Sequence, residues 1–355
     1  MATAESDPQP ESPTKRGFGK RQVIATFLTL AVLVIVFAVV FPQFADYRQA
    51  WDAIQAMSAG WIIALIIATI VVIIVYVWPY QAALPGLKYR PGFMVRQTSF
   101  MISNVIPAGG AIGLGVQFGM LSSYGFGAAP STAAIGITGV WNTFITLALP
   151  VLALIGLLII GEANATVTLV TVLGAVAIGL GIGLFVLILR NEDSARRVGR
   201  WADRVVGWGA GLIGKDGDFR IDQALVDFRA SIVGVVADRW ALITGTNLLQ
   251  QLTQFSVLFV AILAIQGGTG DVNLAEAFAA FAFARLATFI PIPPGGLGTT
   301  DAILTGALTT FGMANGDALA AVLIWRAATY FPQVFIGIGT FLYWRRQPAA
   351  KSGKT

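Results

Sequence analysis

Apolar runs long enough to cross a bilayer as a helix, roughly 20 residues, recur along the chain and are separated by shorter polar segments. The first run is longer than the apolar core of a typical signal peptide, and Pro42-Gln43-Phe44-Ala45 after it is a poor cleavage site. We therefore favour an uncleaved span over a signal peptide. The pattern predicts six full transmembrane helices, at 22–41, 60–84, 131–160, 166–189, 240–265 and 318–344.

Two further apolar stretches are interrupted by proline and glycine. Proline removes a backbone donor and glycine relaxes the helix, so each stretch should form a helix, a turn and a second helix. Irregular backbone at membrane depth is tolerated only where protein or a water-filled cavity surrounds it. The two breaks are therefore candidate binding sites. They are 97–126, broken at Pro107 and Gly109-Gly110, and 285–301, broken at Pro291, Pro293, Pro294 and Gly295-Gly296.

Composition supports a membrane protein and excludes several kinds of site. The chain is 56% apolar and 12% charged, with a mean hydropathy of +0.76, whereas soluble domains carry roughly a quarter charged residues. It contains no His and no Cys, which excludes Cys-based or His-based zinc sites, Cys nucleophiles, disulfides and His acid–base chemistry. We expect no metal and no cofactor. The pI near 9.6 does not indicate nucleic-acid binding, because the basic residues are distributed by membrane topology.

The placement of Lys and Arg decides how the two broken segments are threaded. If each is a re-entrant hairpin, both termini share one face, and that face holds every Lys and Arg except Arg48, Arg285 and Arg326. A single crossing by 97–126 would turn the basic region 190–239 outward, against the positive-inside rule. We therefore predict an all-α polytopic membrane protein with about six full transmembrane helices, two re-entrant helical hairpins and cytoplasmic N- and C-termini.

This threading divides the chain into a disordered basic cytoplasmic tail (1–21), a transmembrane domain (22–344) and a second cytoplasmic tail (345–355). The domain includes a cytoplasmic loop at 190–239. Within it, apolar residues recur at steps of three and four and predict an amphipathic helix. The helix either lies on an anionic leaflet or packs on the protein's own cytoplasmic face. Its apolar residues are Val198, Trp201, Val205, Trp208 and Leu212.

The two hairpin regions resemble each other in sequence. VIPAGG at 105–110 matches PIPPGG at 291–296, and LSSYGF at 121–126 matches LTTFGM at 308–313. The first hairpin would enter from the cytoplasm and the second from outside, so the repeats would be inverted. Inverted repeats with broken helices that meet at the midplane are typical of secondary transporters. The alternative is chance similarity between two apolar, glycine-rich segments.

Ionisable residues inside the membrane cost at least ~2.5 kcal/mol each and are functional candidates by default. Arg285, Asp301 and Arg326 are such residues, and their net positive charge suits a phosphate or another anionic head group. The alternative is a structural Arg–Asp pair that holds the hairpin against the last span. If the charges are functional, Arg326→Gln should abolish transport and leave folded protein; loss of folded protein would favour the structural interpretation.

Polar groups without charge complete the candidate site. In the second half they are the backbone of Gly295 and Gly296 at the turn and the hydroxyls of Thr299 and Thr300 at the following helix N-terminus, where free amides favour an anion. In the first half they are Asn104, Gln117 and Asn142. Because this first set is uncharged, we expect the head group to be gripped from the 285–301 side.

PIPPGGLGTTDAIL, followed by a span that bears an Arg, resembles the flippase-like family typified by the transmembrane region of lysylphosphatidylglycerol synthases. The resemblance covers roughly residues 20–345. In the first half, PAGGAIGLGVQ keeps Pro107 of the family's P-x-x-x-G-E-x-x-R pattern but has neither the acid nor the Arg. The second-half pattern, P-x-x-P-G-G-x-G with a later acid and Arg, is matched by Pro291, Pro294, Gly295, Gly296, Gly298, Asp301 and Arg326.

The resemblance implies a multi-pass protein of a bacterial-type plasma (inner) membrane that moves a lipid between leaflets. We expect a stand-alone member, because the chain ends at Thr355 without an aminoacyltransferase domain. The expected substrate is an anionic or aminoacylated phospholipid, or a polyprenyl-phosphate-type lipid. One alternative is a membrane partner subunit of an envelope glycosyltransferase or lipid-modifying complex.

An intramembrane lipid-modifying enzyme is a further alternative. It is disfavoured because Asp301 and Glu276 are the only candidate bases at membrane level. We therefore expect no enzyme. The expected partners are a lipid substrate and the membrane, with a second copy of the chain or an envelope-synthesis protein as further candidates.

Overall fold

The computed structural model describes residues 47–106, 109–161, 165–212, 220–268, 270, 272–289 and 298–347. These residues form helices and no strand, which confirms the all-α class. The predicted span 22–41, Pro107, and the 290–297 turn with Gly295 and Gly296 lie outside the described residues. The helices are α2 (Tyr47–Gln55), α3 (Ala59–Val75), α4 (Trp78–Ala83), α5 (Tyr89–Val105), α6 (Gly109–Ser123), α7 (Ala128–Ile160), α8 (Ala165–Arg190), α9 (Glu192–Leu212), α10 (Ile221–Ile265), α11 (Leu274–Leu286), the 3-10 turn η3 (Ala287–Phe289), α12 (Thr299–Thr310) and α13 (Asn315–Arg346).

Five helical segments among the described residues are long and apolar enough to cross a membrane. Each corresponds to one of the predicted spans, with ends that differ by a few residues, except that the fourth begins well before residue 240. The chain is therefore a multi-pass membrane protein. The segments are Ala59–Ala83, Ala128–Ile160, Thr171–Arg190, Ile221–Ile265 and Asn315–Arg346.

The polar region 190–239 is mostly helical. α9 occupies the segment predicted as an amphipathic helix, and α10 runs without a break through the expected start of a span at Trp240. The sequence of α10 contains no proline that would stop it. In the sequence, the first half of α10 resembles a polar loop, because its charged residues precede the apolar part of the helix. Arg239 of this half donates to the carbonyl oxygen of Ala82, 3.2 Å away, at the end of α4.

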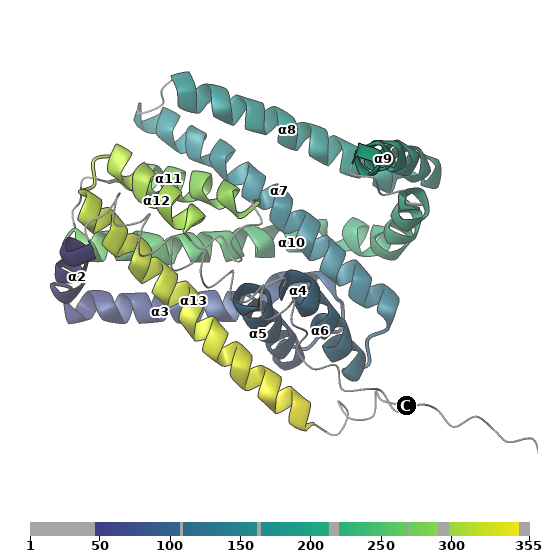
Figure 1. The fold of residues 1–355 in the computed structure, drawn as a ribbon, viewed down its shortest axis with the longest axis horizontal. Helices are drawn as coiled ribbons and strands as arrows, with labels where there is room; N and C mark the ends of the chain where they lie inside the picture. Colours follow the sequence, from purple (N-terminus) through teal and green to yellow (C-terminus); the bar gives the residue numbers. More distant parts are fainter. Residues whose placement is uncertain are drawn as a thin grey trace, which may run out of the picture.

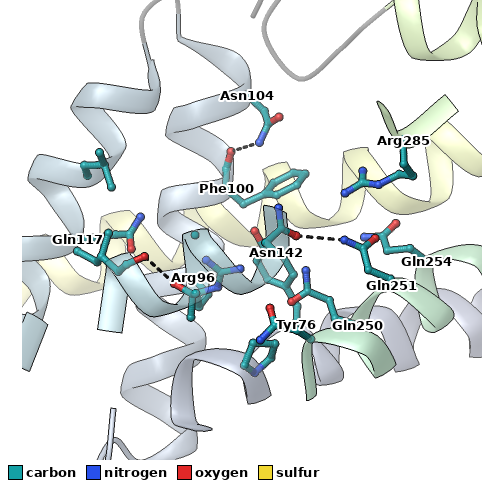
Figure 2. A pocket seen from close by; sticks show the side chains of 16 residues that line it. Tyr76, Arg96, Phe100, Asn104, Gln117, Asn142, Gln250, Gln251, Gln254 and Arg285 are labelled. Carbon is teal, nitrogen blue, oxygen red and sulfur yellow. Dashed lines mark hydrogen bonds between the residues drawn. The ribbon is translucent and has the colours of Figure 1, made fainter. Parts of the chain in front are cut away.

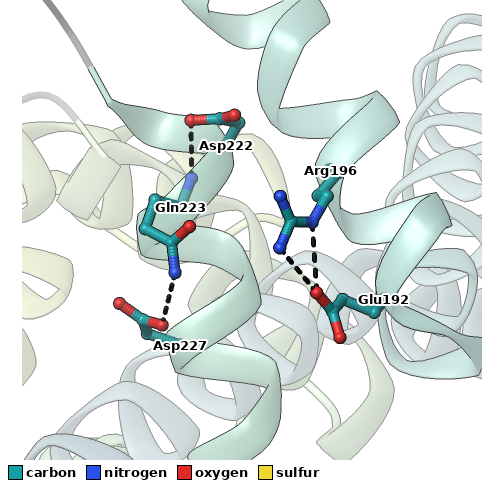
Figure 3. A network of polar contacts seen from close by, with 5 residues as sticks. All are labelled: Glu192, Arg196, Asp222, Gln223 and Asp227. Atoms are coloured by element: carbon teal, nitrogen blue, oxygen red, sulfur yellow. Dashed lines mark hydrogen bonds and ion pairs between the residues drawn. The ribbon is translucent and has the colours of Figure 1, made fainter.

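α9 docks on the start of α10. The Asp203 carboxylate accepts hydrogen bonds from the backbone N–H groups of Ile221 (2.9 Å) and Asp222 (3.3 Å), and a Cβ at Gly199 would lie only 2.2 Å from the Cα of Asp222. The close approach therefore requires glycine. Nearby surface contacts join Glu192 to Arg196 and Gln223 to Asp222 and Asp227 (Figure 3).

The apolar face predicted for α9 is described only in part. The side chains of Val205, Trp208 and Leu212 lie outside the described part. Trp201 of that face is 58% exposed, whereas the contact with α10 is made through Gly199. The two interpretations of the apolar face, a membrane surface or the protein's own surface, both stay predictions.

The helix pairs α5–α6 and α11–α12 have reciprocal positions in the bundle. α2 and the start of α13 lie at one end of the molecule (left in Figure 1), and α9 and the end of α13 lie at the other. The α11–α12 pair lies toward the first end and the α5–α6 pair toward the second. α5 packs against α13, and α11 packs against α7. Each pair therefore contacts the long helix that follows the other pair in sequence.

The repeated segments LSSYGF and LTTFGM form the same helix end. Gly125 and Gly312 both adopt a positive φ, at 87° and 99°. In each case the next residue donates its N–H to a carbonyl five positions earlier, from Phe126 to Leu121 at 3.0 Å and from Met313 to Leu308 at 3.1 Å. The sequence match is thus a match of local structure, formed by the left-handed glycine that ends many helices.

Each helix pair has its own apolar core. One core surrounds Phe281 of α11 and includes Leu304 of α12 and Trp325 of α13. The other surrounds Tyr80 of α4 and includes Met120 of α6. The polar cavity described next lies where α5, α6 and α11 meet α7 and α10.

Candidate functional site

A cavity of about 370 Å³ lies at the centre of the described helices, and most of the side chains around it are polar. Figure 2 shows Arg96 and Arg285 approaching it from opposite sides, with Asn142 and the α10 glutamines between them. The volume falls in the usual range of small-molecule sites. The lining residues are Tyr76, Pro79, Arg96, Phe100, Asn104, Leu114, Gln117, Ile135, Thr138, Gly139, Asn142, Asn247, Gln250, Gln251, Gln254 and Arg285.

The two arginines give the cavity its charge. The Nε atoms of Arg96 and Arg285 are both buried and have no hydrogen-bond partner. The Arg96 guanidinium lies over the Tyr76 ring, 4.2 Å from its centroid, and 5.4 Å from that of Tyr80. Among the described lining residues there is no Asp or Glu. Guanidinium groups that line a cavity without a carboxylate favour an anionic ligand, because their positive charge and planar donor fork suit a phosphate or carboxylate.

α10 presents a face of amide side chains to the same cavity. Asn247, Gln250, Gln251 and Gln254 follow one another at intervals that place them on one side of a helix. Gln251 donates to the carbonyl oxygen of the Asn142 amide, 3.1 Å away, while its own oxygen is buried without a partner. Amides both donate and accept, so this face suits hydroxyl or phosphate-ester groups of a ligand.

Gln117 connects the cavity to its supporting helices. The Tyr80 hydroxyl donates to its side-chain oxygen at 2.9 Å, and its amide nitrogen donates to the Ser99 hydroxyl. The Asn104 amide instead donates to the carbonyl of Phe100 in its own helix, 2.8 Å away. Asn104 therefore keeps its side-chain oxygen available to a ligand.

The predicted site residues separate into two groups. Arg285, Asn104, Gln117 and Asn142 line the cavity together. Asp301, Arg326, Thr299 and Thr300 are not among the lining residues. Gly295 and Gly296 lie outside the described residues. Within the described part, no cluster of three His, Cys, Asp or Glu side chains is placed to hold a metal ion.

Asp301 and Arg326 form a buried ion pair next to the cavity. Arg326 donates from Nε to the carboxylate at 2.9 Å and also from Nη2, and the Gly298 N–H donates to the second carboxylate oxygen at 2.9 Å. The side chain of Asp301 is 2% exposed and that of Arg326 is 16% exposed. The pair fastens the start of α12 to α13, which favours the structural interpretation of these charges. Glu276 has a local role as well, because it completes the N-terminal cap of α11 with Asn273.

Sequence reasoning missed two parts of the cavity. Arg96 was assigned to the cytoplasmic charges next to the first broken segment, but its side chain lines the cavity from α5. The cavity therefore carries charge from beyond the 285–301 side, which is expected to grip the head group, because each helix pair contributes one arginine. The amide face of α10 was also missed, although the spacing 247, 250, 251 and 254 inside an apolar span could have indicated it.

Comparison with known proteins identifies the family. The model of the lysylphosphatidylglycerol synthase transmembrane region matches residues 26–337. The chain belongs to this family. A UPF0104 membrane protein of Methanothermobacter thermautotrophicus is 20% identical over 298 residues, which cover 82% of this chain and 88% of that protein. That protein is therefore similar in length to this chain.

Proposed function

We propose that this protein moves an anionic lipid between the leaflets of a bacterial-type inner membrane, with the lipid head group bound in the central cavity. The observation that supports the proposal is the pair of half-buried arginines, Arg96 and Arg285, which line one amide-rich cavity with no Asp or Glu among its described lining residues. A phosphate group would accept from both guanidinium groups. A phospholipid such as phosphatidylglycerol or a polyprenyl-phosphate-type lipid fits this chemistry, whereas a cationic head group does not.

The arrangement of the helix pairs supports an alternating movement. α5 packs on α13 and α11 packs on α7, and the two repeated segments end their helices in the same way. This reciprocity is what inverted repeats with two re-entrant hairpins would produce. In such an arrangement the cavity opens to one leaflet when one pair moves and to the other leaflet when its counterpart moves. Both termini are then cytoplasmic.

Transport fits the cavity better than catalysis does. Acid–base chemistry needs a group that exchanges protons near the operating pH, and the described lining offers amides, hydroxyls and guanidinium groups. Lipid mass analysis after expression separates the two functions, because an enzyme creates a new lipid species and a transporter only relocates one. A subunit of an envelope-synthesis complex would instead copurify with its partner.

The proposal is tested by reconstituting the purified chain into vesicles that contain fluorescent phosphatidylglycerol, with a membrane-impermeant quencher reporting the outer leaflet. Arg96→Gln and Arg285→Gln should each slow lipid movement by about tenfold or more, since a hydrogen bond to a charged group contributes ~1.5–3 kcal/mol. Arg285→Lys should retain part of the rate, because lysine keeps the charge but not the planar fork. Arg200→Gln, at an exposed position of α9, is the matched control.

Two results would contradict this function. One is a double Arg96→Gln, Arg285→Gln variant that moves lipid at the wild-type rate. The other is a wild-type chain that moves neither phosphatidylglycerol nor a polyprenyl phosphate faster than empty vesicles do.

A further inference from the structure

A second cavity, of about 460 Å³, lies between α7 and α8 and has an almost entirely apolar lining. We call it the α7–α8 groove. Its one hydroxyl, on Thr143, is occupied by a hydrogen bond to the Gly139 carbonyl oxygen, 3.0 Å away. The described lining of the groove therefore offers a polar ligand no free hydroxyl donor. It is lined by Gly136, Gly139, Val140, Thr143, Phe144, Gly181, Leu184, Phe185 and Ile188.

Gly139 connects this groove to the polar cavity, because it lines both. A Cβ placed on Gly139 would have no atom within 4 Å, so space is open beside this residue. Gly136, one turn earlier, differs: a Cβ there would lie 2.3 Å from a ring carbon of Phe228 of α10. The polar cavity and the apolar groove thus share Gly139 as a lining residue, with no side chain at that position to separate them.

Hydrocarbon has access to the groove from outside the bundle. Only 6% of the most apolar window of α8 is buried within the protein, so most of this span faces away from the other described helices and is available to lipid. A third cavity, also apolar and about 430 Å³, lies between α7, α8 and α10 and shares no lining residue with the polar cavity. Phe144 and Phe185 line both apolar spaces and pack edge to face, with 5.7 Å between their ring centroids. Of these two apolar spaces, only the α7–α8 groove shares a lining residue with the polar cavity.

We infer that an acyl chain of the transported lipid lies in the α7–α8 groove and passes Gly139 to join its head group in the polar cavity. This inference rests on the proposed function and deepens it: the ligand is a lipid with a flexible hydrocarbon chain, and a soluble anion would use only half of the site. Burying methylene groups in the groove adds binding free energy that the head group alone lacks. The lack of a side chain at Gly139 leaves room for the acyl chain between the polar cavity and the apolar groove.

The absence of cysteine from the chain allows a direct test. A single Leu184→Cys variant of the full chain carries a fluorophore in the groove, in nanodiscs of phosphatidylcholine. Nitroxide-tailed phosphatidylglycerol and nitroxide-tailed phosphatidylcholine are then compared as quenchers. Bulk lipid quenches with either head group equally, so an excess for phosphatidylglycerol reports a tail whose head group is selected by the arginines. We expect about a tenfold preference, matching one charge-assisted hydrogen bond.

Controls separate the groove from the general lipid surface. Leu173→Cys lies on the same side of α8, about 16 Å away at 1.5 Å per residue, and should show no preference. Gly139→Leu should remove the preference at residue 184, and Ala148→Leu, which fills the third cavity, should not. Ile188→Cys repeats the measurement at another groove residue, in case a label at 184 obstructs the groove.

Each outcome decides one of the two claims. Equal quenching by the two lipids at both groove positions overturns the inference, as does a preference that survives Gly139→Leu. A preference for phosphatidylglycerol at residue 184 without lipid movement in vesicles overturns the proposed transport function and supports acyl-chain binding in the groove. Arginine-dependent lipid movement without a preference at residue 184 or 188 supports the transport function and overturns acyl-chain binding in the groove.

Discussion

Neutralising Asp301 should destabilise the fold rather than alter the ligand site. Its carboxylate is 2% exposed and accepts from Arg326 and from the N–H of Gly298. Asp301→Asn keeps the shape of the side chain and removes its charge, which leaves the Arg326 guanidinium without a counter-charge. Arg326→Gln has the reverse effect and leaves a buried carboxylate.

The expected magnitude follows from the burial of both partners. Removing one partner of a buried ion pair costs ~3–5 kcal/mol. Solvent screening reduces this little, because the side chain of Arg326 is only 16% exposed. The double variant Asp301→Asn, Arg326→Gln contains two neutral amides that can hydrogen-bond to each other. We expect it to recover at least ~2 kcal/mol relative to the sum of the single changes, in the range of coupled neighbours.

The assay is a double-mutant cycle of unfolding in mixed micelles with increasing SDS, followed by the fluorescence of the nine tryptophans. The double variant, once folded, should move lipid at close to the wild-type rate, because neither residue lines the polar cavity. Additive single effects, or single variants as stable as the wild type, would refute the structural interpretation. A stable Arg326→Gln protein that has lost transport would restore the functional interpretation that the sequence suggested.

Two further predictions concern helix packing. Gly337→Ala should destabilise the protein by ~1–3 kcal/mol, because the new methyl would lie 2.5 Å from the Gln97 carbonyl oxygen; wild-type resistance to SDS would contradict this. Asp203→Ala should cost ~0.5–2 kcal/mol, as loss of a helix cap does, because the amide of Ile221 loses its acceptor. Faster hydrogen exchange at the start of α10 is the expected readout, and unchanged exchange there would contradict it.

Four of the predicted spans have ends within a few residues of those in the structure, because these ends carry strong local signals. Gly60 precedes an apolar run and Lys88 follows it, and the helical segment occupies Ala59–Ala83. Gly161 ends α7 with a left-handed conformation, as a glycine after a long apolar helix often does. Positions such as these bound the helices without any tertiary information. Twelve of the sixteen lining residues of the polar cavity, by contrast, were not predicted as site residues, because tertiary packing brings them together.

Arg96 illustrates the limit. In the sequence it stands beside other basic residues just before an apolar segment, where the positive-inside rule explains it fully. Its position at the cavity depends on the aromatic rings of Tyr76 and Tyr80, which lie on other elements and receive its guanidinium. The spacing of residues along α5 does not predict the contact of Arg96 with these two rings. The four amides of α10 differ from Arg96. Their helical periodicity is present in the sequence, and only the cavity that they line together depends on tertiary packing.

α10 has a mechanical consequence that follows from its length. Its 45 residues extend about 68 Å at 1.5 Å per residue, roughly twice the thickness of the hydrocarbon core. One helix without a break therefore joins the docking contact with α9, at Ile221, to the amide side chains of the polar cavity, at residues 247–254. A displacement of α9 that moved α10 as a rigid body would also move these amides.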